Sequence, residues 1–182
     1  MKKQNTALII IDMQRGMADP AAGRRNNPGA EDNIRQLLFA WRDVAGPIVH
    51  VRHMSRSPTS LFWPGQAGNE FQERLTPLSS EHVVEKNVTD AFVNTGLERW
   101  LHMRGIKDLV LVGVSTNMSV EATARSAGNL GFTTTVVADA CFSFDRLDLH
   151  GKPQTAEEVH VHALSNLQGE YAKVVDTSAL LN

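Results

Sequence analysis

Three side chains suited to hydrolysis each follow an apolar, strand-like run in this sequence. Asp12 comes after the first run, Lys86 after the third and Ser119 after the fourth. A carboxylate can accept a proton, a hydroxyl can attack a carbonyl carbon, and a neighbouring ammonium favours the negative forms of both. In an open parallel sheet, ligands bind beyond the carboxyl ends of the strands. We therefore expect these three side chains to meet around one small cavity, provided that the first and fourth strands are neighbours.

Ser119 lies where a predicted strand turns into a helix. The strand is the β-branched run 109–112, and apolar residues at helical spacing follow over 120–130. Unpaired backbone N–H groups in a first helical turn carry a partial positive charge, which stabilises an alkoxide or the oxyanion of a tetrahedral intermediate. Serine is also a common helix cap, so capping alone would account for Ser119. The helix is expected to be capped by Thr116 or Asn117 and to end at Gly131.

Strand-like and helical patterns alternate along the chain, which predicts a parallel α/β sheet. The irregular stretches 13–28 and 54–80 are long enough to be functional loops or a lid. With 182 residues, the chain is expected to form one domain over 1–182. The expected strands are 7–11, 47–51, 82–84, 109–112, 134–137 and 172–175, and the clearest helices are 30–44, 95–103, the one at Ser119 and 156–167.

The composition of the chain excludes several classes of binding partner. The formal net charge is -2, so there is no basic field to hold nucleic acid. The single cysteine, Cys141, excludes a disulfide framework within the chain and a cysteine cluster around zinc, and it suits a reducing cytoplasm. The apolar stretch after the basic first residues is too short for a signal peptide or a membrane span. We expect a cytoplasmic protein with a small-molecule substrate and no nucleic-acid or membrane partner.

Several short motifs follow one another over nearly the whole chain. They are Ile-Ile-Asp12-Met-Gln14, Glu85-Lys86, Asp90-Ala-Phe92, Thr95-Gly-Leu97, Gly113-Val-Ser-Thr-Asn-Met-Ser119-Val, and Ala124-Arg125 with Gly128-Asn-Leu-Gly-Phe132. Each motif is weak alone. As an ordered set, they resemble the isochorismatase-like hydrolase superfamily, also called the cysteine hydrolases, which includes nicotinamidases, N-carbamoylsarcosine amidases and isochorismatases.

The resemblance implies a three-layer α/β/α fold whose six-stranded parallel sheet has the Rossmann-like order 3-2-1-4-5-6. It also implies a triad of aspartate, lysine and cysteine, in which Asp12 and Lys86 match the first two and Ser119 occupies the cysteine position. The bond Val114-Ser115 matches a cis peptide, and with Met118 it would form the turn whose N–H groups face a substrate oxygen. Relatives are often dimers or tetramers, so a homo-oligomer is expected. No cofactor is implied.

Serine at the cysteine position leaves three interpretations open. A hydroxyl ionises far less readily than a thiol, and Asp12 beside Lys86 is expected to have a low pKa and to be a weak base. The serine could be an inactivating replacement in a cysteine amidohydrolase. Alternatively, Ser119 or a water activated by Asp12 hydrolyses a susceptible carbon–nitrogen bond, which we favour as the parent chemistry. As the resemblance to isochorismatases implies, Asp12 could instead protonate a vinyl ether. A non-catalytic protein that binds a small molecule is a further alternative.

Five more residues are candidates for the substrate site. Gln14 is expected to orient Asp12 by hydrogen bonding, or else to be a solvent-exposed loop residue. His53 could reach the substrate from the rim of the pocket. Phe62, Trp63 and Phe71 could form an apolar wall over the substrate, or they could anchor their loop to the core or to a partner subunit.

No metal site is predicted. His50 and His53 are three residues apart at a strand end, which places their imidazoles on opposite faces. His160 and His162 are two apart in a predicted helix, so they do not share a face, and both are expected at the surface or an interface. The remaining candidates are expected to be structural, with Arg125 in an ion pair, Asp139 in a turn or cap and Cys141 as a packed small residue.

Overall fold

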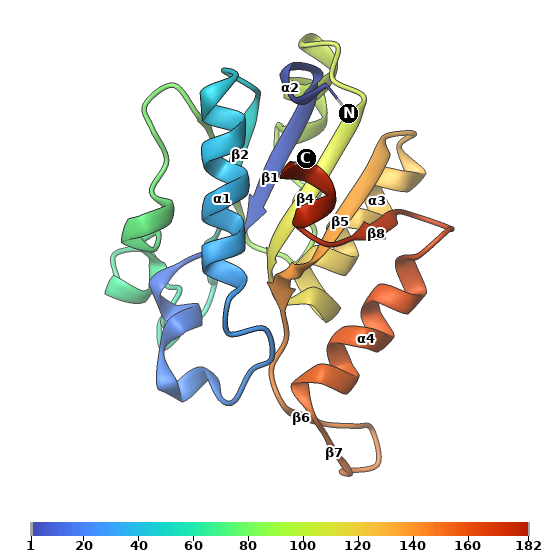
Figure 1. Ribbon diagram of the computed structural model, residues 1–182. Coiled ribbons are helices and arrows are strands. Elements are labelled where there is room, and N and C mark those ends of the chain that lie inside the picture. The colour runs from blue at the N-terminus through green and yellow to red at the C-terminus, as the bar shows by residue number, and fades with distance from the viewer. Residues whose placement is uncertain (1, 182) are drawn as a thin grey trace.

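The computed structural model describes residues 2–181 and contains a six-stranded sheet in the order β3-β2-β1-β4-β5-β8 (Figure 1). Neighbouring strands of this sheet are parallel. The order is the predicted one, and the sixth strand is called β8 because a short hairpin precedes it. The strands are β1 (Thr6–Ile11), β2 (Ile48–His53), β3 (His82–Lys86), β4 (Asp108–Val114), β5 (Thr133–Phe142) and β8 (Lys173–Val175).

Helices cover both faces of the sheet, because the side chains of β1 are apolar in both directions. Leu8 and Ile10 pack into one core with α1, whereas Ile9 and Ile11 pack into a second core with α2 and α3. In Figure 1, α1 and α5 lie in front of the sheet and α3 lies behind it. The predicted three layers are therefore confirmed. The helices are α1 (Ala30–Asp43), α2 (Leu97–Met103), α3 (Glu121–Asn129), α4 (Ala156–Leu167) and α5 (Ser178–Leu181).

The chain leaves β4 through a π-helical turn, η6 (Thr116–Val120), which continues into α3. Ser119 therefore belongs to a π turn, not to the first turn of the predicted α-helix. The predicted caps are wrong, because the side chains of Thr116 and Asn117 bond to His160 and Ser143 instead. Gly131 does follow the end of α3, with a left-handed φ of 85°.

The two irregular stretches contain isolated β-bridges and four short 3-10 helices, and a fifth 3-10 helix precedes β1. The 3-10 helices are η1 (Lys3–Asn5), η2 (Arg15–Ala18), η3 (Pro20–Ala22), η4 (Ala67–Asn69) and η5 (Glu73–Leu75). The hairpin of β6 (Arg146–Leu147) and β7 (Pro153–Gln154) was not predicted, since two-residue strands leave no periodic signal. Among residues 2–181, no helix is long and apolar enough to cross a membrane.

Candidate active site

Asp12, Lys86 and Ser119 meet beyond the carboxyl ends of the central strands. Lys86 Nζ lies 2.7 Å from Asp12 Oδ2 and 3.2 Å from Ser119 Oγ. Because β2 separates β3 from β1, Lys86 has to bridge two strand spacings, roughly 10 Å. A short side chain at the end of β3 could not span that gap. The predicted convergence of the three side chains is therefore present, and the length of lysine makes it possible.

The ammonium of Lys86 donates to three different acceptors. Besides Asp12 and Ser119, it donates to Val88 O at 3.2 Å. Lys86, Asp12 and Ser119 are all buried. Because Ser119 Oγ accepts a hydrogen bond from Lys86, its own proton is left to be donated to another group. The positive charge beside this oxygen favours its ionised form.

Asp12 differs electrostatically from the prediction. It is 1% exposed, and this burial raises the pKa of its carboxyl above the ordinary value, although Lys86 and the nearby Ser119 hydroxyl act in the opposite direction. The expected low pKa is wrong because the free energy lost when the carboxylate is removed from water exceeds the free energy gained from its attraction to Lys86. Within the described residues, Asp12 Oδ1 has no hydrogen-bond partner. Asp12 is therefore a stronger base than the sequence predicted, with one oxygen open to a proton.

The backbone before Ser119 has the predicted unusual geometry, since the Val114-Ser115 peptide bond is cis. The N–H of Met118 donates to Ser115 O at 3.1 Å, and the N–H of Val120 donates to the same oxygen at 3.2 Å. The Met118 N–H is thus used inside the turn. The expected role of this N–H at a substrate oxygen stays a prediction.

Gln14 does not orient Asp12 through its side chain, and it is not exposed. Its amide nitrogen donates to His53 O at 3.0 Å and to Asn69 O at 2.9 Å, and its amide oxygen accepts from the His53 N–H at 2.8 Å. Through these hydrogen bonds, the Gln14 side chain joins the end of β2 to the loop 54–80. Gln14 therefore holds the backbone of His53, a contact between residues 39 positions apart that no local pattern indicates.

His53 lies beside Lys86 and Asp12, and Phe62 packs against His53. His53 interacts electrostatically with Lys86 and Asp12, and burial together with Lys86 lowers the pKa of its imidazole, which favours the neutral ring. The edge of the Phe62 ring packs against His53, with ring centroids 6.2 Å apart. Phe62 is therefore the member of the expected apolar wall that lies against His53, the residue expected at the rim of the pocket.

Phe71 lies away from the central side chains, and Trp63 stays within its own loop. Phe71 packs on His50, with ring centroids 5.8 Å apart, and beneath Arg52. His50 and Arg52 alternate with His53 along β2, so Phe71 covers the opposite face of that strand. Trp63 is half-buried, and its backbone hydrogen bonds join it to Ser60 and Gln66 of its own loop.

Two buried polar residues were missed or misplaced by the sequence analysis. Asn69, 2% exposed, donates to His53 O at 2.9 Å and to Phe62 O at 2.8 Å, so it joins the two residues beside the site. A single asparagine in an irregular loop gives no signal of this role. His160 was expected at the surface or an interface, yet it is 4% exposed inside the chain because η6 packs against α4. His162, the other histidine of this helix, is exposed.

The structural roles expected for three other side chains are confirmed. Arg125 pairs with Glu121 at 2.7 Å, and Asp139 accepts hydrogen bonds from the N–H and hydroxyl of Thr177. Cys141 is fully buried, and burial raises its pKa to about 12. It is therefore unsuited to replace a nucleophile at position 119.

Within residues 2–181, no three His, Cys, Asp or Glu side chains form a group that could hold a metal ion. His50 and His53 occupy opposite faces of β2, as predicted. His50 Nε2 lies 2.8 Å from Glu81 Oε2, whereas His53 faces Lys86 and Asp12.

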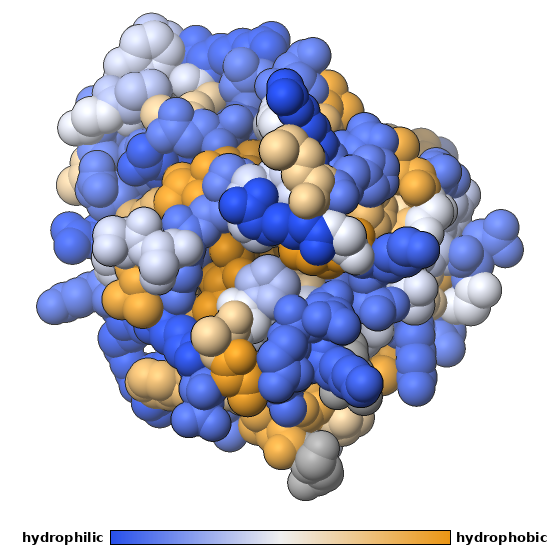
Figure 2. All heavy atoms as spheres, turned by 90° about the horizontal axis from the view of Figure 1, so that it is seen from above, coloured by the Kyte–Doolittle hydropathy of each residue, from blue (hydrophilic) through white to orange (hydrophobic). Residues whose placement is uncertain are grey.

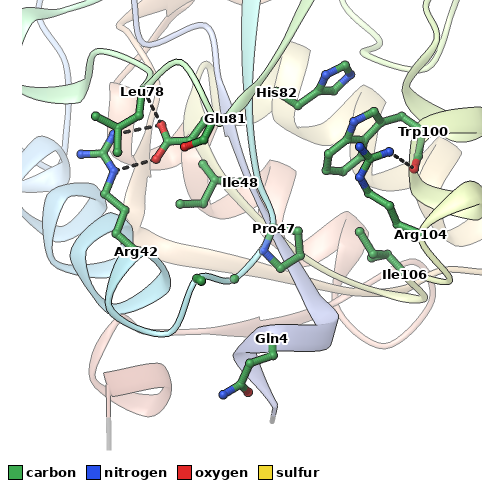
Figure 3. A pocket seen from close by; sticks show the side chains of 13 residues that line it. Gln4, Arg42, Pro47, Ile48, Leu78, Glu81, His82, Trp100, Arg104 and Ile106 are labelled. Carbon is green, nitrogen blue, oxygen red and sulfur yellow. Dashed lines mark hydrogen bonds and ion pairs between the residues drawn. The ribbon is translucent and has the colours of Figure 1, made fainter.

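A cavity of about 640 Å³ opens at the other end of the sheet, where the strands begin. Seen from that side, hydrophobic residues show between hydrophilic ones in the middle of the surface and again along the lower edge of the view (Figure 2). Figure 3 shows that charged groups of this cavity are already engaged, with Arg42 paired to Glu81 and Arg104 beside Trp100. His82 stacks parallel to the same indole, 4.5 Å between centroids. These pairings point to a structural role.

Glu81→Gln is expected to lower the free energy of unfolding by about 2 kcal/mol at neutral pH. Burial alone would raise the pKa of Glu81, but hydrogen bonds from Arg42, His50 and the Leu78 N–H outweigh it and lower the pKa to about 2. The stabilisation is therefore complete above the unfolded-state pKa of about 4.3 and is lost as the pH falls through the folded-state value.

Urea unfolding measured between pH 7 and pH 2 tests this, and the difference between the variant and the unchanged protein should shrink over the lower part of that range. Glu85→Gln, at an exposed ion pair with Arg52, is the control and should change stability by less than about 1 kcal/mol. An effect of Glu81→Gln that stays constant with pH would contradict the prediction.

Comparisons with known proteins agree with this fold. The family model described as the isochorismatase domain matches residues 6–179. A crystal structure of a putative hydrolase of the isochorismatase family from Chromobacterium violaceum is 44% identical, covers 100% of this chain and 94% of that chain, and superposes with a TM-score of 0.96.

Curated relatives give the same result. The uncharacterized isochorismatase family protein YrdC of Bacillus subtilis is 34% identical over 99% of this chain and 96% of its own length. Nicotinamidase 3 of Arabidopsis thaliana is 30% identical over 96% of this chain and 86% of its own length. With a matching model over nearly all of the chain and relatives similar along their full lengths, this protein belongs to the isochorismatase-like hydrolase family.

Proposed function

We propose that this protein hydrolyses a carbon–nitrogen bond, amide or ureido, of a small molecule, with Asp12, Lys86 and Ser119 as its catalytic residues. The observation that carries the proposal is the position of Lys86 Nζ, which lies within hydrogen-bond distance of both Asp12 and Ser119. Similarity to a nicotinamidase, an enzyme named for an amide substrate, supports this choice of bond.

The geometry supports a two-step reaction. Ser119 Oγ attacks the substrate carbonyl carbon while Asp12 takes the hydroxyl proton, and Lys86 stabilises the negative charge that develops on Oγ. The carbon–nitrogen bond breaks as Asp12 passes this proton to the leaving nitrogen, which leaves the acyl group esterified to Ser119. Water then attacks the ester, giving one proton to Asp12 and its hydroxyl to the acyl carbon. Asp12 returns the proton to Ser119 as the acid leaves.

Burial of Asp12 supports serine as the nucleophile. A hydroxyl needs a base in the transition state, and the raised pKa of Asp12 makes its carboxylate better matched to that task. Because only the ionised form can accept the proton, the rate should fall as the pH drops through the pKa of Asp12, above the ordinary range of an aspartate.

Ser119→Cys is expected to increase amide hydrolysis at neutral pH by on the order of tenfold or more, because a thiol beside Lys86 ionises more readily than a hydroxyl. The measurement is turnover of nicotinamide and of a panel of small primary amides and ureido acids. Cys141→Ser in the same background is the control and should leave the gain intact, since Cys141 is buried. Alkylation of the introduced thiol should abolish the activity.

Hydrolysis of a vinyl ether is the second candidate, and the same raised pKa of Asp12 favours it, since a buried carboxyl that holds its proton can act as an acid. The variant Ser119→Ala distinguishes the two candidate reactions. It should remove amide hydrolysis but retain hydrolysis of a vinyl ether, which needs no nucleophile at this position. If neither activity appears in the unchanged protein or in Ser119→Cys, a non-catalytic binding protein is the better description.

A further inference from the structure

His160 is a buried imidazole that the proposed reaction does not use. Its Nδ1 lies 2.8 Å from the hydroxyl oxygen of Thr116, the first residue of η6. Thr116 precedes Ser119 by three positions, and α4 packs directly against η6. His160 therefore joins α4 to the turn that carries the proposed nucleophile.

Asn27 determines which ring nitrogen of His160 carries the proton. Asn27 Nδ2 lies 2.7 Å from Cys141 O and 3.0 Å from Ala138 O, so this atom has to be the amide nitrogen, because an oxygen there would face two carbonyls. The same nitrogen lies 3.5 Å from His160 Nε2. A proton on Nε2 would face this donor, so the neutral ring carries its proton on Nδ1, where it is donated to Thr116 Oγ1.

The turn has a second side-chain tether next to the first. Asn117 Oδ1 accepts a hydrogen bond from the hydroxyl of Ser143 at 3.1 Å. The residue preceding η6 provides no side-chain cap. These contacts from α4 and from the segment after β5 therefore hold two consecutive residues of the turn, and they limit how far Ser119 can move from Lys86.

We propose that His160 is a positioning residue: its Nδ1–H holds Thr116, and with it η6, where Ser119 Oγ reaches Lys86 Nζ. The importance of this contact for catalysis rests on the proposed function. The geometry itself can be measured without turnover, through the ionisation of a thiol placed at position 119.

The experiment uses the full chain with Ser119→Cys and Cys141→Ser, in which the introduced thiol faces Lys86 and Asp12, and His53 lies beside both of these residues. Alkylation by iodoacetamide over a range of pH gives the pKa of this thiol. In this background, His160 is changed to Asn, Gln or Leu, and separately Thr116 is changed to Val. The amide nitrogen of asparagine can replace Nδ1 as a donor to Thr116, whereas glutamine places its nitrogen near the position of Nε2.

We expect His160→Leu, His160→Gln and Thr116→Val each to raise the thiol pKa and to slow alkylation at neutral pH by about tenfold, because the thiol moves away from Lys86. His160→Asn should restore both values. A role in core packing alone would not distinguish asparagine from glutamine in this way. Combining His160→Leu with Thr116→Val should add nothing, since either change removes the same hydrogen bond.

Equal thiol pKa values in all variants with a native circular dichroism spectrum would overturn the proposal, as would asparagine behaving like leucine. If His160→Leu does not fold, the nearly isosteric Thr116→Val still decides the result. Failure of the proposed function gives a different outcome, in which the Ser119→Cys protein turns over no amide while the thiol pKa values still report on His160.

Discussion

Asp12→Asn is expected to lower kcat/KM for amide hydrolysis by about 10³-fold, because an amide side chain cannot accept the proton of the nucleophile or deliver it to the leaving nitrogen. The effect is best measured in the Ser119→Cys background, where the signal is largest. The oxygen expected to take this proton is Asp12 Oδ1, which has no hydrogen-bond partner within the described residues. The substitution keeps the shape of the side chain and removes its basicity.

A loss of activity could also follow from a loss of stability, so the experiment needs a second variant. Removing the charge of Asp12 leaves the buried ammonium of Lys86 without its ion-pair partner, which costs about 3–5 kcal/mol. Changing Lys86 to Met together with Asp12→Asn removes the unpaired charge and should restore most of the stability, but it should not restore hydrolysis. Asp139→Asn is the control for loss of a structural carboxylate and should keep kcat/KM within a few fold.

Hydrolysis that survives in Asp12→Asn at more than a tenth of the starting rate would exclude Asp12 as the proton carrier. Full recovery of activity in the double variant would have the same meaning. In either case, the position of Lys86 beside Asp12 and Ser119 would have to serve the binding of the small molecule and not proton transfer.

Gly113→Ala is expected to lower the free energy of unfolding by about 4 kcal/mol or more. Gly113 has a φ of 122°, and a Cβ added there would lie 2.1 Å from Ile11 O and 2.8 Å from Ile11 N. Both neighbours are backbone atoms of β1, which pairs with β4 at this position, so they cannot move away without breaking the sheet. The same close approach brings the end of β4 beside Asp12.

Urea unfolding followed by circular dichroism gives the magnitude, with Gly96→Ala as the matched control. Gly96 has no atom within 4 Å of an added Cβ, and it precedes α2, so its replacement should cost less than about 1 kcal/mol. A variant at Gly113 that fails to accumulate in folded form while the control does would be the extreme form of the expected result. Equal stability of the two variants would refute the argument from close backbone approach.

The sheet was predictable because its signal is local. Each strand is an apolar run bounded by polar or glycine residues, and the pattern of β1 requires cover on both faces, which only a parallel sheet with helices on both sides provides. The strand ends were underestimated: β3 continues through Lys86 and β5 through Phe142. At the end of β3 the side chains turn polar while the backbone ladder continues. In β5 the β-branched run ends at Val137 and gives way to Ala138 and Asp139, which mark no strand in the sequence pattern although the strand continues.

Electrostatics and side-chain contacts were predictable only in part. The charge of Lys86 suggested a low pKa for Asp12. The direction in which the pKa of Asp12 shifts depends instead on how deeply its carboxyl is buried, and that is set by all of the surrounding elements. Gln14 and Phe71 were both expected at the substrate site. Gln14 instead binds the backbone of His53, and Phe71 covers the opposite face of β2.

The sequence by itself determined the order of the strands, through the resemblance, and the placement of a carboxylate, an ammonium and a hydroxyl at strand ends. These properties follow from residue type and from spacing along the chain. Only the tertiary structure decided that burial raises the pKa of Asp12, that His160 faces η6, and that Lys86 Nζ lies within hydrogen-bond distance of two oxygens. Those properties depend on which groups from distant segments exclude water or come within 3 to 4 Å, and nothing in the local pattern specifies that.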